Sequence, residues 1–218
     1  MTYTRLIGIT FGWMIDHIVR WLALSRIHPN VLTFIGLVIN CAAAWLLAQG
    51  KFFAAGMVVL GAALFDMVDG RVARATDRVT RFGGFFDSVL DRYSDLALFF
   101  GLLVYYASIN RFFYIVLTAI VMTGSVMVSY TRARAENSIP SCKVGFLERP
   151  ERVVLVIIGA LMDRMAPVLW VIAVLSNLTV VHRMIYTYKQ AKQLEDAQLR
   201  AVPNPPESRV PSPTRQYE

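Results

Sequence analysis

DMVDGRVAR, residues 66–74, and GGFFDSVLD, residues 83–91, place four carboxylates beside two of the most apolar segments of this chain. On helices, residues three and four apart share a face, so Asp66 lies with Asp69, and Asp87 lies with Asp91. Carboxylates at membrane depth are costly unless they are paired or bind a metal, so they mark a functional site. Four of them suit a hard divalent cation that takes oxygen ligands.

Composition indicates an integral membrane protein. Hydrophobic residues make up 56% of the chain and charged residues only 17%, which lies outside the range of soluble proteins. A spanning helix needs about 20 apolar residues. Two of the apolar stretches are weaker by this measure, because one is short and another carries aspartates in its first half. Counting both gives six predicted spans: residues 31–49, 52–68, 83–107, 112–129, 153–162 and 166–181.

Basic residues fall in alternate loops, which predicts the topology. Cytoplasmic loops carry an excess of Lys and Arg. The loops after the second and fourth spans are rich in arginine, whereas the opposite loops hold only Lys51, Arg111 and Arg164. An even number of spans follows, with both termini and the site on the cytoplasmic side of the inner membrane. The net charge of +7 then reflects topology and anionic lipid headgroups, and we expect no nucleic-acid partner.

The two ends differ from the central region. Residues 1–27 show polar and apolar positions at helical spacing, which predicts an amphipathic juxtamembrane helix lying in the interface. Residues 28–192 form the six-helix domain. The Pro-rich segment 193–218 is expected to be a disordered cytoplasmic tail. The predicted fold class is an all-α integral membrane protein with six transmembrane helices and this additional interfacial helix.

The spacing D-x2-D-G-x2-A-R-x8-G-x3-D-x3-D is matched without exception from Asp66 to Asp91. It resembles the signature of the CDP-alcohol phosphotransferase family, membrane enzymes that make phospholipid headgroups. The resemblance extends over residues 28–190, because residues 28–33 are also similar to the beginning of the family's first span. It implies a six-helix bundle, a homodimer and a polar cavity open to the cytoplasm.

The resemblance also implies roles for individual residues. Asp66, Asp69, Asp87 and Asp91 would hold one or two Mg²⁺ or Mn²⁺ ions. Asp91 would also be the catalytic base, taking the proton from an acceptor hydroxyl that attacks the β-phosphorus of CDP-diacylglycerol and releases CMP. Besides Asp66 and Asp69, the residues implied in binding the CDP-lipid are Asn30, Val31, Leu32, Thr33, Gly70, Ala73, Arg74 and Thr80.

Several arginines at the same membrane level favour an acceptor that carries phosphate, because Arg binds phosphate oxygens bidentately. The motifs SYTRARAE, residues 129–136, and ERPER, residues 148–152, resemble phosphatidylinositol phosphate synthases, which use inositol phosphate; those enzymes have Lys where this chain has Arg132. Each arginine could instead be a positive-inside anchor. The candidates for the acceptor phosphate are Arg132, Arg134, Arg149, Arg152 and Arg183.

Three alternatives remain open. Glycerol 3-phosphate would also need arginines, although phosphatidylglycerophosphate synthases usually have L-D-P-x-x-D-K where this chain has residues 86–92. A cation transporter would spread its acids near the midplane, in related halves with broken helices. Asp66 and Asp69 could also pair with Arg71 and Arg74 at a solvated helix end. Asp95, outside the signature, is expected to be structural.

Overall fold

The computed structural model describes residues 29–75 and 80–201, and it describes the side chains of residues 30–66 and 80–197. In this part of the chain it is all-helical, with no strand. Each predicted apolar stretch lies in one helix. These helices are α2 (Pro29–Ala48), α3 (Phe52–Ala75), α4 (Arg81–Ser108), α5 (Phe112–Ala135), α6 (Arg149–Leu161) and α7 (Met165–Ala201).

Among the described residues, three helices are long and apolar enough to cross a membrane by length and composition: Asn30–Ala48, Phe112–Ala135 and Met165–Ala197. The other three fall short for physical reasons. The apolar part of α3 is the shorter segment Phe52–Asp66, α4 carries acidic residues in its first half, and α6 has only 13 residues. The expectation of six spans is therefore confirmed only as six helices.

The C-terminal end of the helical region differs from the expectation. Helix α7 continues to Ala201, past the expected domain boundary at residue 192, so residues 193–201 are helical rather than a disordered tail. This segment lacks the apolar pattern on which the boundary was based, but it has few helix-breaking residues before Pro203. The predicted amphipathic helix at residues 1–27 and the remainder of the tail lie outside the described residues.

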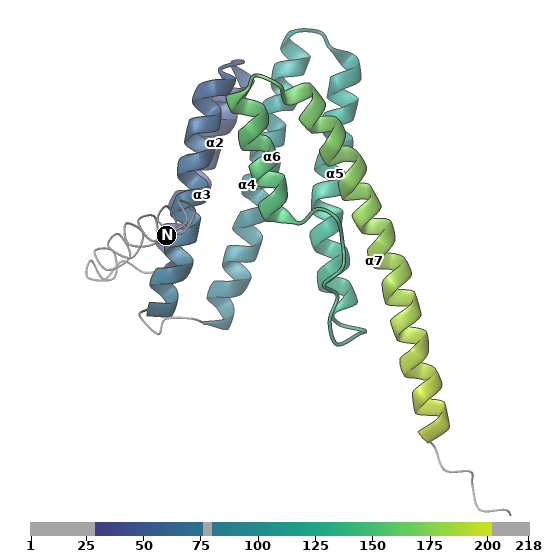
Figure 1. Ribbon diagram of the computed structural model, residues 1–218. Coiled ribbons are helices and arrows are strands. Elements are labelled where there is room, and N and C mark those ends of the chain that lie inside the picture. The colour runs from purple at the N-terminus through teal and green to yellow at the C-terminus, as the bar shows by residue number, and fades with distance from the viewer. Residues whose placement is uncertain (1–28, 76–79, 202–218) are drawn as a thin grey trace, which may run out of the picture.

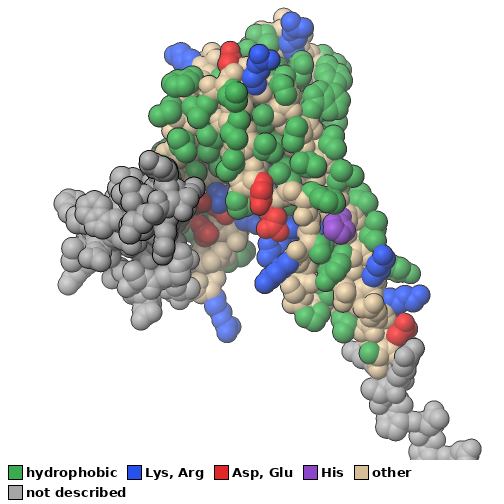
Figure 2. Space-filling view, in the orientation of Figure 1, with side chains coloured by type: hydrophobic (Ala, Val, Ile, Leu, Met, Phe, Trp, Pro, Cys, Tyr) green, Lys and Arg blue, Asp and Glu red, His purple; other side chains and the backbone are tan. Residues whose placement is uncertain are grey.

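The helices form a bundle in which α2 packs on α3 and α4, α5 packs on α4 and α7, and α6 packs on α3 and α7 (Figure 1). Its core is built from side chains such as Leu47, Val59, Leu102 and Ile172. Hydrophobic side chains cover most of the upper part of the bundle, while acidic and basic side chains gather in its lower half (Figure 2). The charged region predicted from the sequence is thus a distinct level of the molecule.

Two helices that carry the site begin with specific caps. The Thr80 hydroxyl accepts a hydrogen bond from the Gly83 N–H at 2.9 Å, which fixes the start of α4. Helix α6 begins with a capping box: the Glu148 side chain accepts from the Glu151 N–H, and the Glu151 carboxylate accepts from the Glu148 N–H at 3.0 Å. Pro150 lies in the first turn, where its missing N–H has no cost.

Candidate active site

Three of the four signature aspartates converge between the C-terminal half of α3 and the N-terminal half of α4. Asp66, Asp87 and Asp91 each offer a carboxylate oxygen, and these oxygens lie within 4.8 Å of one another. We call these three residues the acidic cluster. Asp69 lies one turn after Asp66 in α3, and its side chain is outside the described residues. Three converging carboxylates repel each other unless a cation lies among them, so the arrangement fits a divalent ion.

A cationic side chain from α6 reaches into the acidic cluster. One terminal nitrogen of Arg149 lies 2.9 Å from the Asp66 carboxylate, and the other lies 2.9 Å from the Asp91 carboxylate. The sequence suggested Arg149 as a contact for the acceptor phosphate. The structure instead places it against two predicted metal ligands, where it offsets part of their charge.

A buried ion pair lies one turn deeper. Asp95 follows Asp91 on α4 and pairs with Arg152 of α6; their side chains are 7% and 2% exposed. The Asp95 carboxylate also lies 3.9 Å from Arg149. The Nε and Nη1 atoms of Arg152 have no hydrogen-bond partner among the described residues. Asp95 was expected to be structural, and its partner proves to be one of the candidate acceptor residues.

A cavity of about 250 Å³ opens beside the acidic cluster, between α2, α3, α4 and α6. Its polar lining includes Asn40, Asp66, Asp91 and Arg149, and the remaining wall is largely aliphatic. A site with a charged end and an apolar wall suits a molecule with a charged head and an apolar body. The cavity thus has the character expected of a lipid-nucleotide site.

The other residues predicted to bind the CDP-lipid divide into several groups. Thr33 lines the cavity, whereas Leu32 is buried and Val31 is exposed. A β-carbon added to Gly83 would lie 3.4 Å from the Asn30 side-chain oxygen, so Asn30 lies close to the start of α4. Thr80 is the cap of α4 rather than a free hydroxyl. The side chains of Gly70, Ala73 and Arg74 are outside the described residues.

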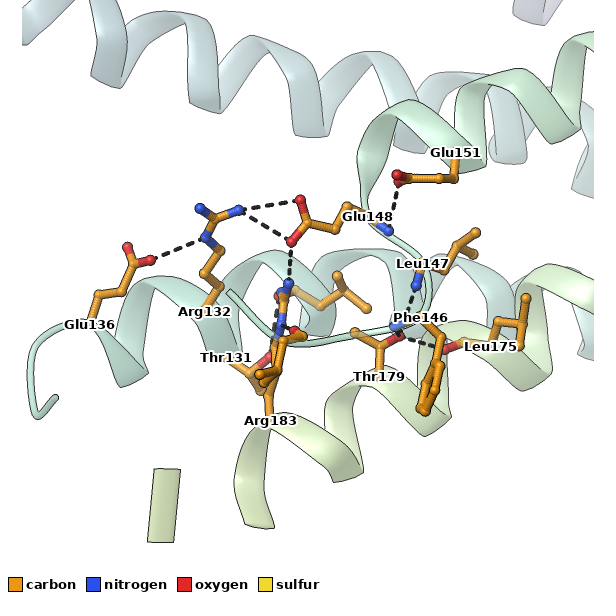
Figure 3. A network of polar contacts seen from close by, with 12 residues as sticks. Thr131, Arg132, Glu136, Phe146, Leu147, Glu148, Glu151, Leu175, Thr179 and Arg183 are labelled. Carbon is orange, nitrogen blue, oxygen red and sulfur yellow. Dashed lines mark hydrogen bonds and ion pairs between the residues drawn. The ribbon is translucent and has the colours of Figure 1, made fainter. Parts of the chain in front are cut away.

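A second charged centre lies between α5, α6 and α7 (Figure 3). The Glu148 carboxylate accepts from Arg183 Nη2 at 2.8 Å and from Arg132 Nη1 at 3.3 and 3.4 Å. We call Arg132 and Arg183 the arginine pair. Arg132 also donates to Glu136 at 3.1 Å. Two of the candidate acceptor arginines therefore converge, and they do so on a carboxylate.

The loop before α6 is attached to α7 by two side chains. The Thr179 hydroxyl accepts from the backbone N–H groups of Phe146 and Leu147, at 3.0 and 3.1 Å, and donates to Leu175 O (Figure 3). Arg183 Nε donates to Val144 O at 2.7 Å. These contacts hold the start of α6, and with it Glu148 and Arg149, in a defined position.

Arg134 does not join the arginine pair. It lines a groove between α5 and α7, together with Tyr130, Tyr188 and Arg183. Positions 132 and 134 are two residues apart, so a helix directs them to different sides. Arg132 therefore reaches Glu148, while Arg134 has no contact with Glu148 among the described residues.

Sequence reasoning did not find Glu148 or Thr179. The motif around Pro150 indicates a helix start, but Glu is not among the preferred N-cap residues. No sequence signal therefore identified Glu148 as the carboxylate that binds two arginines. Thr179 lies within an apolar stretch and resembles an ordinary small polar residue of a spanning helix. Its role depends on a loop more than 30 residues away in the chain and has no local signal.

Comparisons with known proteins agree with these observations. A family model described as CDP-alcohol phosphatidyltransferase matches residues 26–189. The chain is 36% identical over 182 residues to an archaetidylinositol phosphate synthase from Pyrococcus horikoshii, covering 83% of this chain and 93% of that protein. It is 39% identical over 185 residues to a phosphatidylinositol phosphate synthase from Mycobacterium tuberculosis, covering 80% and 85%.

Solved structures give the same result. The crystal structure of the Mycobacterium tuberculosis phosphatidylinositol phosphate synthase with CDP-DAG bound has a TM-score of 0.74 and 35% identity, covering 80% of this chain and 93% of that chain. The structure of the same synthase in complex with manganese and citrate also has a TM-score of 0.74, with 36% identity and coverage of 80% and 88%.

Proposed function

The chain belongs to the CDP-alcohol phosphatidyltransferase family, and from this premise we propose that it transfers a phosphatidyl group from CDP-diacylglycerol to a hydroxyl of inositol phosphate, with release of CMP. One observation carries the proposal: the first turn of α6 contacts the acidic cluster through Arg149 and the arginine pair through Glu148. A site for a pyrophosphate and a site for an acceptor phosphate would then lie beside one another. Relatives named for inositol phosphate products support this choice of acceptor.

The acidic cluster fits Mg²⁺ or Mn²⁺. Its three carboxylate oxygens are close enough to bind one ion, and we propose that Asp66, Asp87 and Asp91, with Asp69, are the ligands. When bound, the cation would neutralise the pyrophosphate and stabilise the leaving CMP. A relative whose structure was solved in complex with manganese and citrate supports this assignment.

Asp91 is the proposed catalytic base. Its carboxylate lies at the cavity, held at 2.9 Å by Arg149. It would take the proton from the acceptor hydroxyl as that oxygen bonds to the phosphorus nearest the diacylglycerol. The bond from this phosphorus to the bridging oxygen of CMP would break, and CMP would leave with the electron pair. Phosphoryl transfer depends mostly on positioning and charge stabilisation, so a fixed base at the cavity suits it.

The CDP-lipid would occupy the cavity between α2, α3, α4 and α6. Thr33 and Asp66 line its wall, and Asn30 lies close to the start of α4. These placements support part of the predicted CDP-lipid set. The contacts assigned to Asp69, Gly70, Ala73 and Arg74 stay predictions, as does the homodimer. Thr80 is retained as the residue that fixes the start of α4.

The arginine pair is the proposed acceptor-phosphate site. Both guanidinium groups converge on one anionic group, which is the geometry that a phosphate requires. Arg152, with two free donor nitrogens, lies one turn further along α6 from Arg149. Arg134 is left out of the proposed set because, among the described residues, it has no ion pair with Glu148, although it shares a groove with Arg183. Family membership favours a transferase over the cation transporter considered from the sequence.

A panel of acceptors tests the function directly. Purified protein would be incubated with CDP-diacylglycerol, Mg²⁺ or Mn²⁺, and inositol phosphate, inositol, glycerol 3-phosphate or serine. CMP release and the mass of the lipid product would be measured for each acceptor. We expect turnover with inositol phosphate. Faster turnover with glycerol 3-phosphate would assign the phosphatidylglycerophosphate reaction instead, and no CMP with any acceptor would refute the proposal.

Substitution of Asp91 tests the catalytic base. Asp91→Asn is expected to lower kcat by about 100-fold or more, because loss of a general base has effects of roughly 10²–10⁴, while binding of CDP-diacylglycerol is largely retained. Asp163→Asn is the matched control, since Asp163 lies in the α6–α7 turn at a positive φ of 53° that Asn also tolerates. Comparable turnover in the Asp91 variant and the control would remove Asp91 from the mechanism.

A further inference from the structure

The carboxylate of Glu148 occupies the position between the arginine pair that a phosphate would need. We infer that Glu148 is a built-in anion that fills the acceptor-phosphate site of the substrate-free enzyme and is displaced when the phosphate binds. This inference rests on the proposed function, which places the acceptor's phosphate at Arg132 and Arg183. It adds a residue that sets the affinity of that site and its selectivity for phosphorylated acceptors.

The contacts of Glu148 are those of an anionic ligand. One carboxylate oxygen lies 2.8 Å from Arg183 Nη2 and 3.3 Å from Arg132 Nη1, and the other lies 3.4 Å from the same Arg132 atom. Two oxygens on a single centre, shared between two guanidinium groups, are also what a phosphate monoester presents. Carboxylate and phosphate therefore compete for the same donors, and one excludes the other.

Burial determines which group moves. The Arg183 side chain is 2% exposed and is fixed by further hydrogen bonds to Val144 O and Val128 O. The side chains of Glu148 and Arg132 are 40% and 38% exposed. The deep arginine is thus a rigid anchor, while the carboxylate lies on the open side and can rotate into solvent.

The N-terminus of α6 can bind the incoming phosphate in place of the Glu148 carboxylate. The Glu148 carboxylate also accepts the Glu151 N–H as the cap of α6, so its departure exposes a backbone donor. A helix N-terminus favours an anion through its free N–H groups and its dipole. An incoming phosphate can take over this donor together with the arginine pair. An alcohol without phosphate offers no such replacement, so it leaves Glu148 in place.

The expected effect follows from population arithmetic. When only a fraction of the enzyme has a free site, the apparent affinity for the ligand is reduced by that fraction. Removing the internal anion removes this reduction. Glu148→Gln keeps the length of the side chain and an oxygen that can cap α6, and it removes the negative charge. We expect the KM for inositol phosphate to fall by roughly three- to tenfold, with a smaller change in the KM for CDP-diacylglycerol.

Glu136→Gln is the matched control. Glu136 pairs with Arg132 at 3.1 Å but has no contact with Arg183 among the described residues. Exposed pairs of this kind contribute little, so the KM for inositol phosphate is expected to stay within about twofold of the wild-type value. A second variant, Glu148→Asn, provides a good N-cap residue that is too short to retain both arginine contacts. It is expected to behave like Glu148→Gln.

A binding measurement separates this inference from the proposed function. Inorganic phosphate would be added to the full-length protein without CDP-lipid, and the shift in Tm would be recorded. We expect phosphate to raise the Tm of Glu148→Gln and Glu148→Asn more than that of the wild type or Glu136→Gln. Equal shifts, or a KM for inositol phosphate that is unchanged or higher in both Glu148 variants, would overturn the inference. A wild type inactive with every phosphorylated acceptor would overturn the proposed function, while the comparison of Tm shifts would still decide the role of Glu148.

Discussion

At the scale of single residues, Asp95 and Arg152 form the most buried charged contact of the site. A buried ion pair contributes little net stability, but removing one partner leaves an uncompensated charge in a place that excludes water. The pair joins α4 to α6 directly behind Asp91 and Arg149. It therefore fixes the distance between the proposed base and the turn that contacts it.

A double-mutant cycle tests this pair. Arg152→Met is expected to destabilise the protein by about 3–5 kcal/mol, because Asp95 stays buried with only the longer contact to Arg149, at 3.9 Å, remaining. Adding Asp95→Leu is expected to restore most of the loss. Unfolding in detergent would be followed for both variants, with Arg132→Met as the exposed control at about 1 kcal/mol or less. Equal losses in the single and double variants would show that the pair does not couple α4 to α6.

The signature aspartates were predictable and their surroundings were not. Asp66, Asp87 and Asp91 meet because helical periodicity places them on faces that the membrane forces together, and periodicity is a local property of sequence. The contacts of Glu148, Arg149 and Thr179 depend instead on how the start of α6 docks against three other helices. That docking is a tertiary property, so the five candidate arginines, which look alike in the sequence, do not lie in one site.

At the scale of helices, the apolar stretches predicted where helices form but not where they touch. Helices α2 and α4 cross most closely at Gly101, where a β-carbon would collide with the backbone oxygen of Ala44. The absent side chain lets two backbones approach, as small residues do in membrane bundles. The position of α4, and so of Asp87 and Asp91, depends on this contact.

Gly101→Ala is expected to force α2 and α4 apart and lower both Tm and turnover, since backbone atoms cannot move aside as a flexible side chain can. Gly61→Ala in α3 is the control, because a β-carbon there meets nothing within 4 Å. Ala is the better helix former by about 0.5–1 kcal/mol, so the control is expected to be neutral or slightly stabilising. A tolerated Gly101 variant would show that the crossing can relax.

At the scale of the whole molecule, the charged level and the chain topology agree. The C-terminal ends of α3, α5 and α7 all lie toward the lower end of the bundle in Figure 1, where Figure 2 shows the larger group of charged side chains, with a smaller group at the upper end. If all six helices cross the membrane, these ends lie on one side. The positive-inside rule assigns that side to the cytoplasm, where a soluble acceptor and CMP would be exchanged.

Reporter fusions test this orientation. A fluorescent protein fused after the last residue of the chain is expected to fluoresce, and alkaline phosphatase at the same position is expected to be inactive, because folding of each reporter depends on its compartment. A fusion in the loop between α4 and α5, around Asn110, provides the internal comparison with the opposite pattern. The reverse pattern at either position would contradict the predicted orientation.

Glu148 and Arg149 are consecutive residues, and each neutralises the opposite charge of a different cluster. Arg149 lies beside the carboxylates that would bind the cation, and Glu148 lies where the acceptor phosphate would bind. Displacing Glu148 or Arg149 changes the contacts of the same segment, the start of α6. Binding of the acceptor and binding of the donor therefore act on one structural element. Donor and acceptor are then expected to help each other bind, and such cooperativity must be equal in both directions.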